Sequence, residues 1–244
     1  MIVLKSVWTL EYMRDAGKTA ADPLVEEKDA VQPGVATLEL DKIAEKYIRN
    51  CGNAAVRSGY DGFPGAICLS RNAEIVHGSP GLKKLKNGDT VNIDVGAEKD
   101  GCCDGAFKRF AGSEDAAAFQ RLSDVTKASP YKGIALAMVK PRFGGVSRAV
   151  PTHGYGIVRE YVGHGIGRKM HEDPQIPNDG SAGRSPKLTP EMTLALEPMF
   201  KLGAHEVKTL DDEWTAIPKD RKPSAYFEQV VADCGDAPEF LIKR

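Results

Sequence analysis

Three carboxylates stand alone inside short apolar runs of this chain, and they limit what it can fold into. Asp94 interrupts Val-Asn-Ile-Asp-Val, Glu197 interrupts Leu-Ala-Leu-Glu-Pro-Met, and Glu228 interrupts Tyr-Phe-Glu-Gln-Val-Val. Short apolar runs of this composition are typical of strands with a buried face. A carboxylate is costly to bury there unless it is paired or bound to a metal ion. The fold must therefore supply each of these acids with a partner.

Two histidines in a glycine-framed segment are candidate partners for the acids. His164 stands in Tyr-Val-Gly-His-Gly-Ile-Gly-Arg, and His171 opens His-Glu-Asp-Pro-Gln a few residues later. Carboxylate oxygens together with imidazole nitrogen suit divalent first-row metal ions. Taken one at a time, these residues also have ordinary explanations, as a turn cap, a loop histidine or solvent-facing strand carboxylates. Only their joint occurrence points to a site.

Composition places the chain among ordinary globular proteins and excludes several classes. It has 244 residues, which suffice for one large domain or two small ones, and 41% hydrophobic content. Its formal net charge of −1 does not indicate a nucleic-acid partner. No apolar run approaches the roughly 18 residues that span a bilayer, and the first residues do not resemble a signal peptide, so the cytoplasm is expected. Five cysteines without a Cys-x-x-Cys pair predict neither a disulfide framework nor a zinc knuckle.

Periodicity and turn residues predict a mixture of helices and strands. We expect helices from Thr9 to a break at Pro23, over 37–50, and over 115–139 with an interruption at Pro130; strands over 66–70, 90–95, 192–196 and 226–231; a hairpin turn at Lys99-Asp100-Gly101; and a surface loop over 177–190. This order suits an α+β domain with one central sheet.

The motifs, taken in order, resemble those of type I methionine aminopeptidases. Besides the segments quoted above, the resemblance rests on Gly-Tyr-Asp-Gly-Phe-Pro at 59–64, His-Gly-Ser-Pro at 77–80 and Gly-Asp-Thr-Val-Asn-Ile-Asp-Val at 88–95. It extends from about Thr9 to about Val231. It implies the pita-bread fold, a curved antiparallel sheet with helices on its outer face, and a single catalytic domain over 1–244.

The resemblance also implies an activity. A family member removes the N-terminal methionine from nascent proteins and peptides with a metal-activated water, in the cytoplasm. It implies up to two divalent metal ions, which would be cobalt, manganese, iron or zinc. The expected partners are the N-terminal methionine of polypeptides and the ribosome, with no nucleic acid and no membrane, and the chain is expected to be a monomer.

Individual roles follow from the positions that match the family motifs. The implied metal ligands are Asp94, Asp104, His164, Glu197 and Glu228. Among catalytic residues, His77 would contact the substrate amine, His171 the scissile carbonyl, and Glu197 would accept the proton of the water. The implied methionine pocket consists of Tyr60, Phe63, Cys68, Met170 and Trp214.

Two positions depart from the family pattern. The family reads Asp-Gly-x-x-Gly-Asp after the hairpin turn, but here the last two residues are Asp104-Gly105. Without a gap, Gly105 takes the ligand position and Asp104 points to the opposite strand face, unless a bulge turns it back. Arg57 stands where relatives often have a smaller cysteine, and its guanidinium needs solvent or an acid.

Three functions therefore compete. The first is the metal-dependent methionine aminopeptidase. The second is a pita-bread binding protein or impaired enzyme without a complete two-metal site, which Gly105 and Arg57 favour. The third is an aminopeptidase P or prolidase-like enzyme, against which the compact length and the Gly-Tyr-Asp-Gly-Phe-Pro segment argue.

Overall fold

The computed structural model describes residues 1–110, 117–139, 154–180, 187–233 and 237–242. The helices are α1 (Val7–Ala21), α2 (Pro23–Ala30), α3 (Thr37–Asn50) and α4 (Ala117–Val139), with a 3-10 turn η1 at Tyr60–Gly62. The strands are β1 (Ala54–Ala55), β2 (Ile67–Arg71), β3 (Val91–Lys99), β4 (Cys102–Phe110), β5 (Gly156–Ile157), β6 (Gly163–Gly165), β7 (Glu172–Ile176), β8 (Thr193–Leu196), β9 (Met199–Lys201), β10 (Val207–Thr209), β11 (Ala216–Pro218), β12 (Ser224–Tyr226), β13 (Gln229–Asp233) and β14 (Pro238–Phe240).

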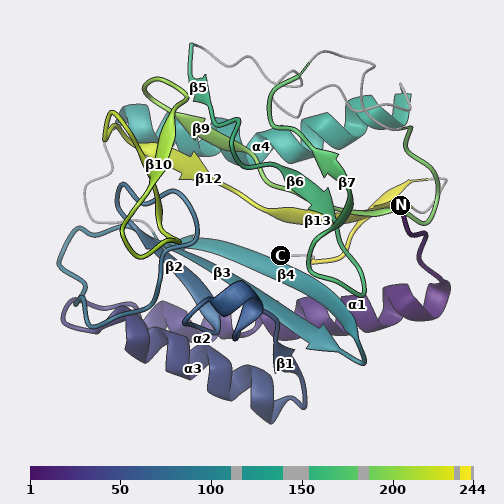
Figure 1. Ribbon diagram of the computed structural model, residues 1–244, viewed down its shortest axis with the longest axis horizontal. Coiled ribbons are helices and arrows are strands. Elements are labelled where there is room, and N and C mark those ends of the chain that lie inside the picture. Colours follow the sequence, from purple (N-terminus) through teal and green to yellow (C-terminus); the bar gives the residue numbers. More distant parts are fainter. Residues whose placement is uncertain (111–116, 140–153, 181–186, 234–236, 243–244) are drawn as a thin grey trace.

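Strands fill the middle of the molecule and helices cover its two outer sides (Figure 1). Helices α1, α2 and α3 lie along the sheet of β1 to β4, and α4 lies along β9 and β12. All strand pairings among the described residues are antiparallel. The predicted α+β class, with antiparallel strands inside and helices outside, is confirmed. The described strands form four hydrogen-bonded sheets of four, two, three and five strands, not the one central sheet that was predicted.

The N-terminal helices begin and end where local chemistry requires. Helix α1 is capped by Ser6, whose Oγ accepts the backbone N–H of Thr9 at 3.2 Å. The predicted cap at Thr9 is therefore wrong, because Ser6 already supplies the oxygen that the first turn needs. The predicted break at Pro23 is confirmed, since α1 ends at Ala21 and Pro23 opens α2, where a missing N–H costs nothing. Helix α3 has the predicted bounds.

The hairpin of β3 and β4 fixes the register at the departure from the family pattern. Its turn residues Asp100 and Gly101 have φ of 49° and 73°, which a tight two-residue turn requires. The pairing then runs without a shift, and it sets Ala97 opposite Asp104 and Gly96 opposite Gly105. An unbroken ladder leaves no bulge to reorient Asp104, so this residue and Gly105 face opposite sides.

The predicted strand over 226–231 is two strands, β12 and β13, and its antiparallel partner is divided in the same way. Tyr226 pairs with Met199 of β9, and Gln229 pairs with Leu196 of β8. Both segments interrupt their strand pairing at the same level. There the backbone N–H of Phe227 donates to the carbonyl of Pro198 at 3.2 Å. This shared break places Glu197 and Glu228 on neighbouring segments.

Helix α4 passes through Pro130 without the predicted interruption. A proline in a helix leaves the carbonyl four residues earlier without its usual donor. Here that carbonyl belongs to Thr126, and it accepts the hydroxyl of Ser129 at 2.8 Å. The substitute donor explains why the helix continues. Residues 115–116 of the predicted helix and 181–186 of the predicted loop lie outside the described residues.

Candidate active site

Four ligand-type side chains are brought together by four different elements. Asp94 comes from β3, His164 from β6, Glu197 from the end of β8, and Glu228 from the segment before β13. The Nε2 of His164 lies 2.9 Å from Oε1 of Glu197, because β6 pairs with β8 at this level. Burial opposes the charged form of His164, but the hydrogen bond and charge of Glu197 outweigh it and raise the pKa of the imidazole.

A guanidinium group sits among these carboxylates. Arg57 follows β1, and its Nη2 forms an ion pair with Oδ2 of Asp94. The two side chains are only 15% and 8% exposed, so the pair is shielded from water. Burial alone would lower the pKa of Arg57, but the charges of Asp94 and then of Cys68 and Glu228 raise it above its usual value. The buried arginine thus meets the sequence requirement for an acidic partner.

A tyrosine that sequence analysis did not single out joins two of the acids. The hydroxyl of Tyr226 donates to Oε2 of Glu228 at 2.7 Å and lies 3.4 Å from Oε2 of Glu197. Burial and the neighbouring Glu197 and Glu228 charges raise the pKa of this phenol well above 10, which keeps the proton on its oxygen. Its position two residues before Glu228, on the same face of an extended chain, is the signal that could have found it.

The side chain of Asp104 points away from this cluster. A Cβ built on Gly17 of α1 would lie 2.9 Å from Cγ of Asp104, so the carboxylate lies against the helix. Its Oδ1 accepts the N–H of Gly105 at 2.8 Å, and its Oδ2 has no partner among the described residues. Burial raises the pKa of Asp104 well above its usual value. The sequence-based assignment of Asp104 as a metal ligand does not agree with this geometry, because the unbroken β3–β4 ladder directs its side chain toward α1.

Gly105 faces the cluster instead, and a side chain at this position would press against Glu228. A Cβ on Gly105 would lie 3.1 Å from Oε1 of Glu228. Beside it is a cavity of about 20 Å³, which is room for about one water molecule. Its lining includes Arg57, Asp94, His164, Met170 and Glu228.

The residues present do not fit a pair of metal ions. Gly105 supplies no side-chain oxygen, and Asp94 is already paired with Arg57. Among the described residues, no three His, Cys, Asp or Glu side chains stand in an arrangement that could hold an ion as they are. The donor chemistry of His164, Glu197 and Glu228 suits one divalent ion, provided that the hydrogen bond between His164 and Glu197 opens.

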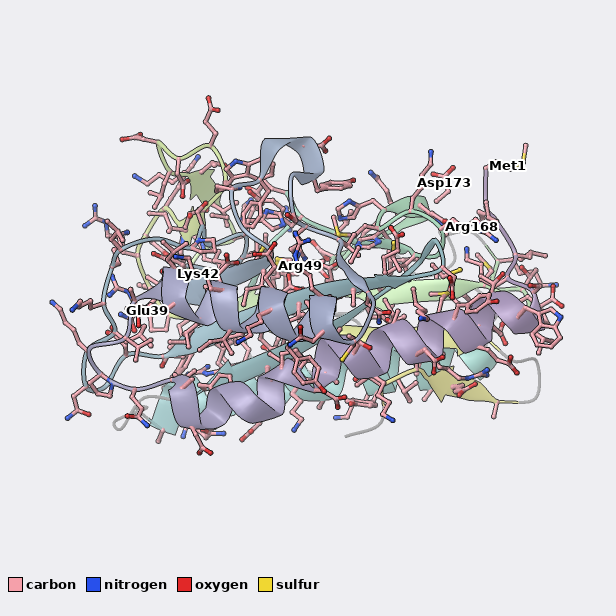
Figure 2. All side chains as sticks on the ribbon, turned by 90° about the horizontal axis from the view of Figure 1, so that it is seen from below. Met1, Glu39, Lys42, Arg49, Arg168 and Asp173 are labelled. Atoms are coloured by element: carbon pink, nitrogen blue, oxygen red, sulfur yellow. The ribbon has the colours of Figure 1, made fainter. Side chains whose placement is uncertain are left out.

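A cleft of about 750 Å³ opens beside the His164–Glu197 pair, and both predicted catalytic histidines line it. The ring of His77 packs edge-on against Tyr161 at 5.3 Å, and the ring of His171 lies 4.3 Å from that of His164. Burial is the main cause that lowers the pKa of both His77 and His171 to about 4. Both imidazoles are therefore neutral at pH 7. Met1, Arg168 and Asp173 lie together at the edge of the cleft (Figure 2).

The five residues implied in the methionine pocket come from separate segments of the chain. Phe63 and Trp214 pack edge-to-face with ring centroids 5.2 Å apart. The hydroxyl of Tyr60 lies 2.8 Å from Nδ1 of His171. Cys68 is buried on β2 opposite Asp94, and Met170 borders the small cavity beside Gly105.

Comparison with known proteins places this fold and site in a family. Residues 11–231 match Metallopeptidase family M24. The methionine aminopeptidase of Clostridium perfringens is 42% identical over 245 residues, which cover 99% of this chain and 98% of that protein. The crystal structure of methionine aminopeptidase from Thermotoga maritima has a TM-score of 0.91 and 35% identity, and all of both chains is covered. The X-Pro aminopeptidase of the same organism, at 17% identity and a TM-score of 0.72 over 62% of its chain, shares the fold.

The chain belongs to metallopeptidase family M24, and its curated relatives at about 40% identity are methionine aminopeptidases. The predicted membership, the pita-bread fold and the assignment to metal-dependent aminopeptidases are thereby confirmed. The aminopeptidase interpretation is favoured over a binding protein. None of the helices that the structure describes is long and apolar enough to cross a membrane.

Proposed function

We propose that this chain hydrolyses the peptide bond after an N-terminal methionine in peptides and nascent polypeptides. The observation that carries the proposal is the His164–Glu197 pair, at 2.9 Å, beside a cleft that His77 and His171 also line. Identity of 42% with a methionine aminopeptidase over nearly the whole chain supports the same substrate. The whole chain acts as one catalytic domain and as a monomer.

Three polar residues of the cleft, His77, His171 and Glu197, have proposed roles in this reaction. Glu197 accepts a proton from the attacking water, since its carboxylate stays ionised beside His164. His77 contacts the substrate amine, and His171 donates a hydrogen bond to the scissile carbonyl. The hydroxyl of Tyr60 holds the His171 ring in place from its Nδ1 side. Both neutral imidazoles are suited to hydrogen bonding without repelling the substrate ammonium group.

The substrate methionine is held by apolar and soft side chains. The proposed pocket consists of the edge-to-face pair Phe63 and Trp214 together with Tyr60, Cys68 and Met170. An unbranched thioether packs well against aromatic rings and sulfur. This chemistry favours methionine over a branched or charged side chain.

One divalent ion, which would be cobalt, manganese, iron or zinc, is proposed at His164, Glu197 and Glu228. Such an ion lowers the pKa of water and polarises a carbonyl. Since Gly105 offers no oxygen, we expect slower turnover than in relatives with a complete ligand set. We place the activity in the cytoplasm, with the ribosome as the source of nascent chains and without nucleic acid or membrane partners.

A direct test is hydrolysis of a Met-Ala-Ser peptide by the purified protein with Mn²⁺. Free methionine should be released, and Glu197→Gln should reduce kcat/KM by about a hundredfold or more, in the range of a lost general base. Arg49→Ala, on the exposed face of α3, is the control and should leave the rate unchanged. Absence of methionine release at every metal concentration, from a folded protein, would reject the proposed function.

A further inference from the structure

The ion pair of Arg57 and Asp94 stands where sequence resemblance places a metal ligand. The guanidinium is buried, its Nη2 contacts Oδ2 of Asp94, and its Nε has no partner among the described residues. Its charge also acts on Glu228, Glu197 and both cleft histidines. A fixed positive charge therefore already lies inside the carboxylate cluster.

Arg57 and Gly105 line the same small cavity. Arg57, Asp94 and Glu228 line this space of about 20 Å³, and Gly105 contributes only backbone. An aspartate at 105 would add one negative charge, whereas Arg57 adds one positive charge. The two departures from the expected pattern together make the cluster more positive by two charges, which equals the charge of one divalent ion.

We propose that Arg57 is a built-in cation that takes the place of one divalent metal ion, so that the chain binds no more than one such ion. The inference rests on the proposed function for its assumption that the remaining donors hold a metal. The guanidinium neutralises Asp94 directly, and Tyr226 donates to Glu228, so these acids are satisfied without a second ion. A second divalent ion would have to displace a buried, hydrogen-bonded guanidinium of like charge.

The experiment compares Mn²⁺ binding in four proteins by titration calorimetry and elemental analysis after dialysis. These are the unchanged protein, Arg57→Met, Gly105→Asp, and the double variant Arg57→Met with Gly105→Asp. The methionine keeps most of the side-chain volume but removes the charge. We expect at most one ion per chain in the unchanged protein and in Gly105→Asp. Two ions should appear in the double variant, with the second bound roughly a hundredfold or more tighter than in Gly105→Asp, as removal of a nearby like charge implies.

Thermal unfolding supplies a readout that does not depend on activity. With EDTA, Arg57→Met should melt at a lower temperature than the unchanged protein, because Asp94 loses its partner. Added Mn²⁺ should restore most of that loss in the variant and shift the unchanged protein much less. Arg57→Lys keeps the charge and should resemble the unchanged protein. Arg49→Ala, which alters an exposed pair with Glu45, is the matched control and should show no metal-dependent difference.

Two results would overturn the inference. One is two ions bound by the unchanged protein, and the other is a melting temperature of Arg57→Met that responds to Mn²⁺ no more than that of Arg49→Ala. Failure of the proposed function would look different, because no variant would then release methionine from Met-Ala-Ser whatever its metal content.

Discussion

The hydroxyl of Tyr226 donates to Glu228 at 2.7 Å. The bond lies where two antiparallel segments interrupt their pairing, between the pair Tyr226–Met199 and the pair Gln229–Leu196. This bond favours the ionised form of Glu228, but burial and the nearby Asp94 charge outweigh it and raise the pKa of the carboxyl well above its usual value. Tyr226 acts on the site through Glu228 and is therefore a positioning residue.

Tyr226→Phe removes the hydroxyl group that donates a hydrogen bond to Glu228. We expect a loss of about 1–3 kcal/mol in the free energy of unfolding, as for a buried group deprived of its partner. Urea denaturation measures the loss. Tyr12→Phe, on an α1 side chain that is 38% exposed, should change stability by less than about 0.5 kcal/mol. Equal midpoints for the two variants would contradict the role of the Tyr226 hydroxyl.

Asp104→Asn should stabilise the protein increasingly as pH rises. Burial raises the folded-state pKa of Asp104 above its unfolded value near 3.9, so the folded chain binds this proton more tightly. Stability from this group is present below the unfolded pKa and falls as pH rises toward the folded pKa, by about 1.4 kcal/mol per unit. Asparagine does not titrate and should remove this loss. Denaturation curves between pH 4 and pH 7 test it, and a constant difference between the proteins across that range would show that Asp104 does not titrate as expected.

Gly17→Ala tests where the Asp104 side chain points. Alanine usually stabilises a helix relative to glycine by about 1 kcal/mol. Here its Cβ would approach Cγ of Asp104 to 2.9 Å, so we expect a destabilisation of about 1–3 kcal/mol instead. In an Asp104→Gly background the same change should become neutral or favourable. A double-mutant cycle measures the coupling, and additive effects would place Asp104 elsewhere.

Exchange of the reversed pair tests the register of β4. Asp104→Gly with Gly105→Asp puts a carboxylate on the face of Glu228 and removes the one against Gly17. Metal affinity and kcat/KM should rise together by about tenfold or more, because an added ligand strengthens both ion binding and activation of water. The number of bound ions should stay below two while Arg57 is present. If Asp104→Ala alone abolishes metal binding, Asp104 is a ligand after all.

Peptides that differ in the residue after methionine test the shape of the cleft. The ring of His77 packs edge-on against Tyr161, and both residues line the cleft. We expect this wall to favour a small side chain after the methionine. We expect a kcat/KM for Met-Ala-Ser above that for Met-Leu-Ser by about tenfold or more. Cleavage of the two peptides at equal rates would show that this wall does not select the substrate.

Most of the secondary structure followed from local patterns. Helix α3 has its predicted bounds, and the turn at Asp100-Gly101 was recognised from its residue types. Errors occurred where a neighbour supplied a missing group: Ser6 capped α1 ahead of Thr9, and Ser129 replaced the donor that Pro130 lacks. In both cases a side chain a few residues away decided the outcome, which propensity alone does not describe.

The sequence by itself determined the family, the order of the motifs, and the presence of lone acids and histidines that need partners. It also determined the two-residue turn between the strands. Asp104 and Gly105 lie on opposite faces because successive strand residues alternate, which is a local property. Only the tertiary structure decided that Arg57 pairs with Asp94, 37 positions away, and that Tyr226 lies between Glu197 and Glu228. Such contacts depend on how distant segments pack, and a buried charge adopts whichever partner that packing brings within reach.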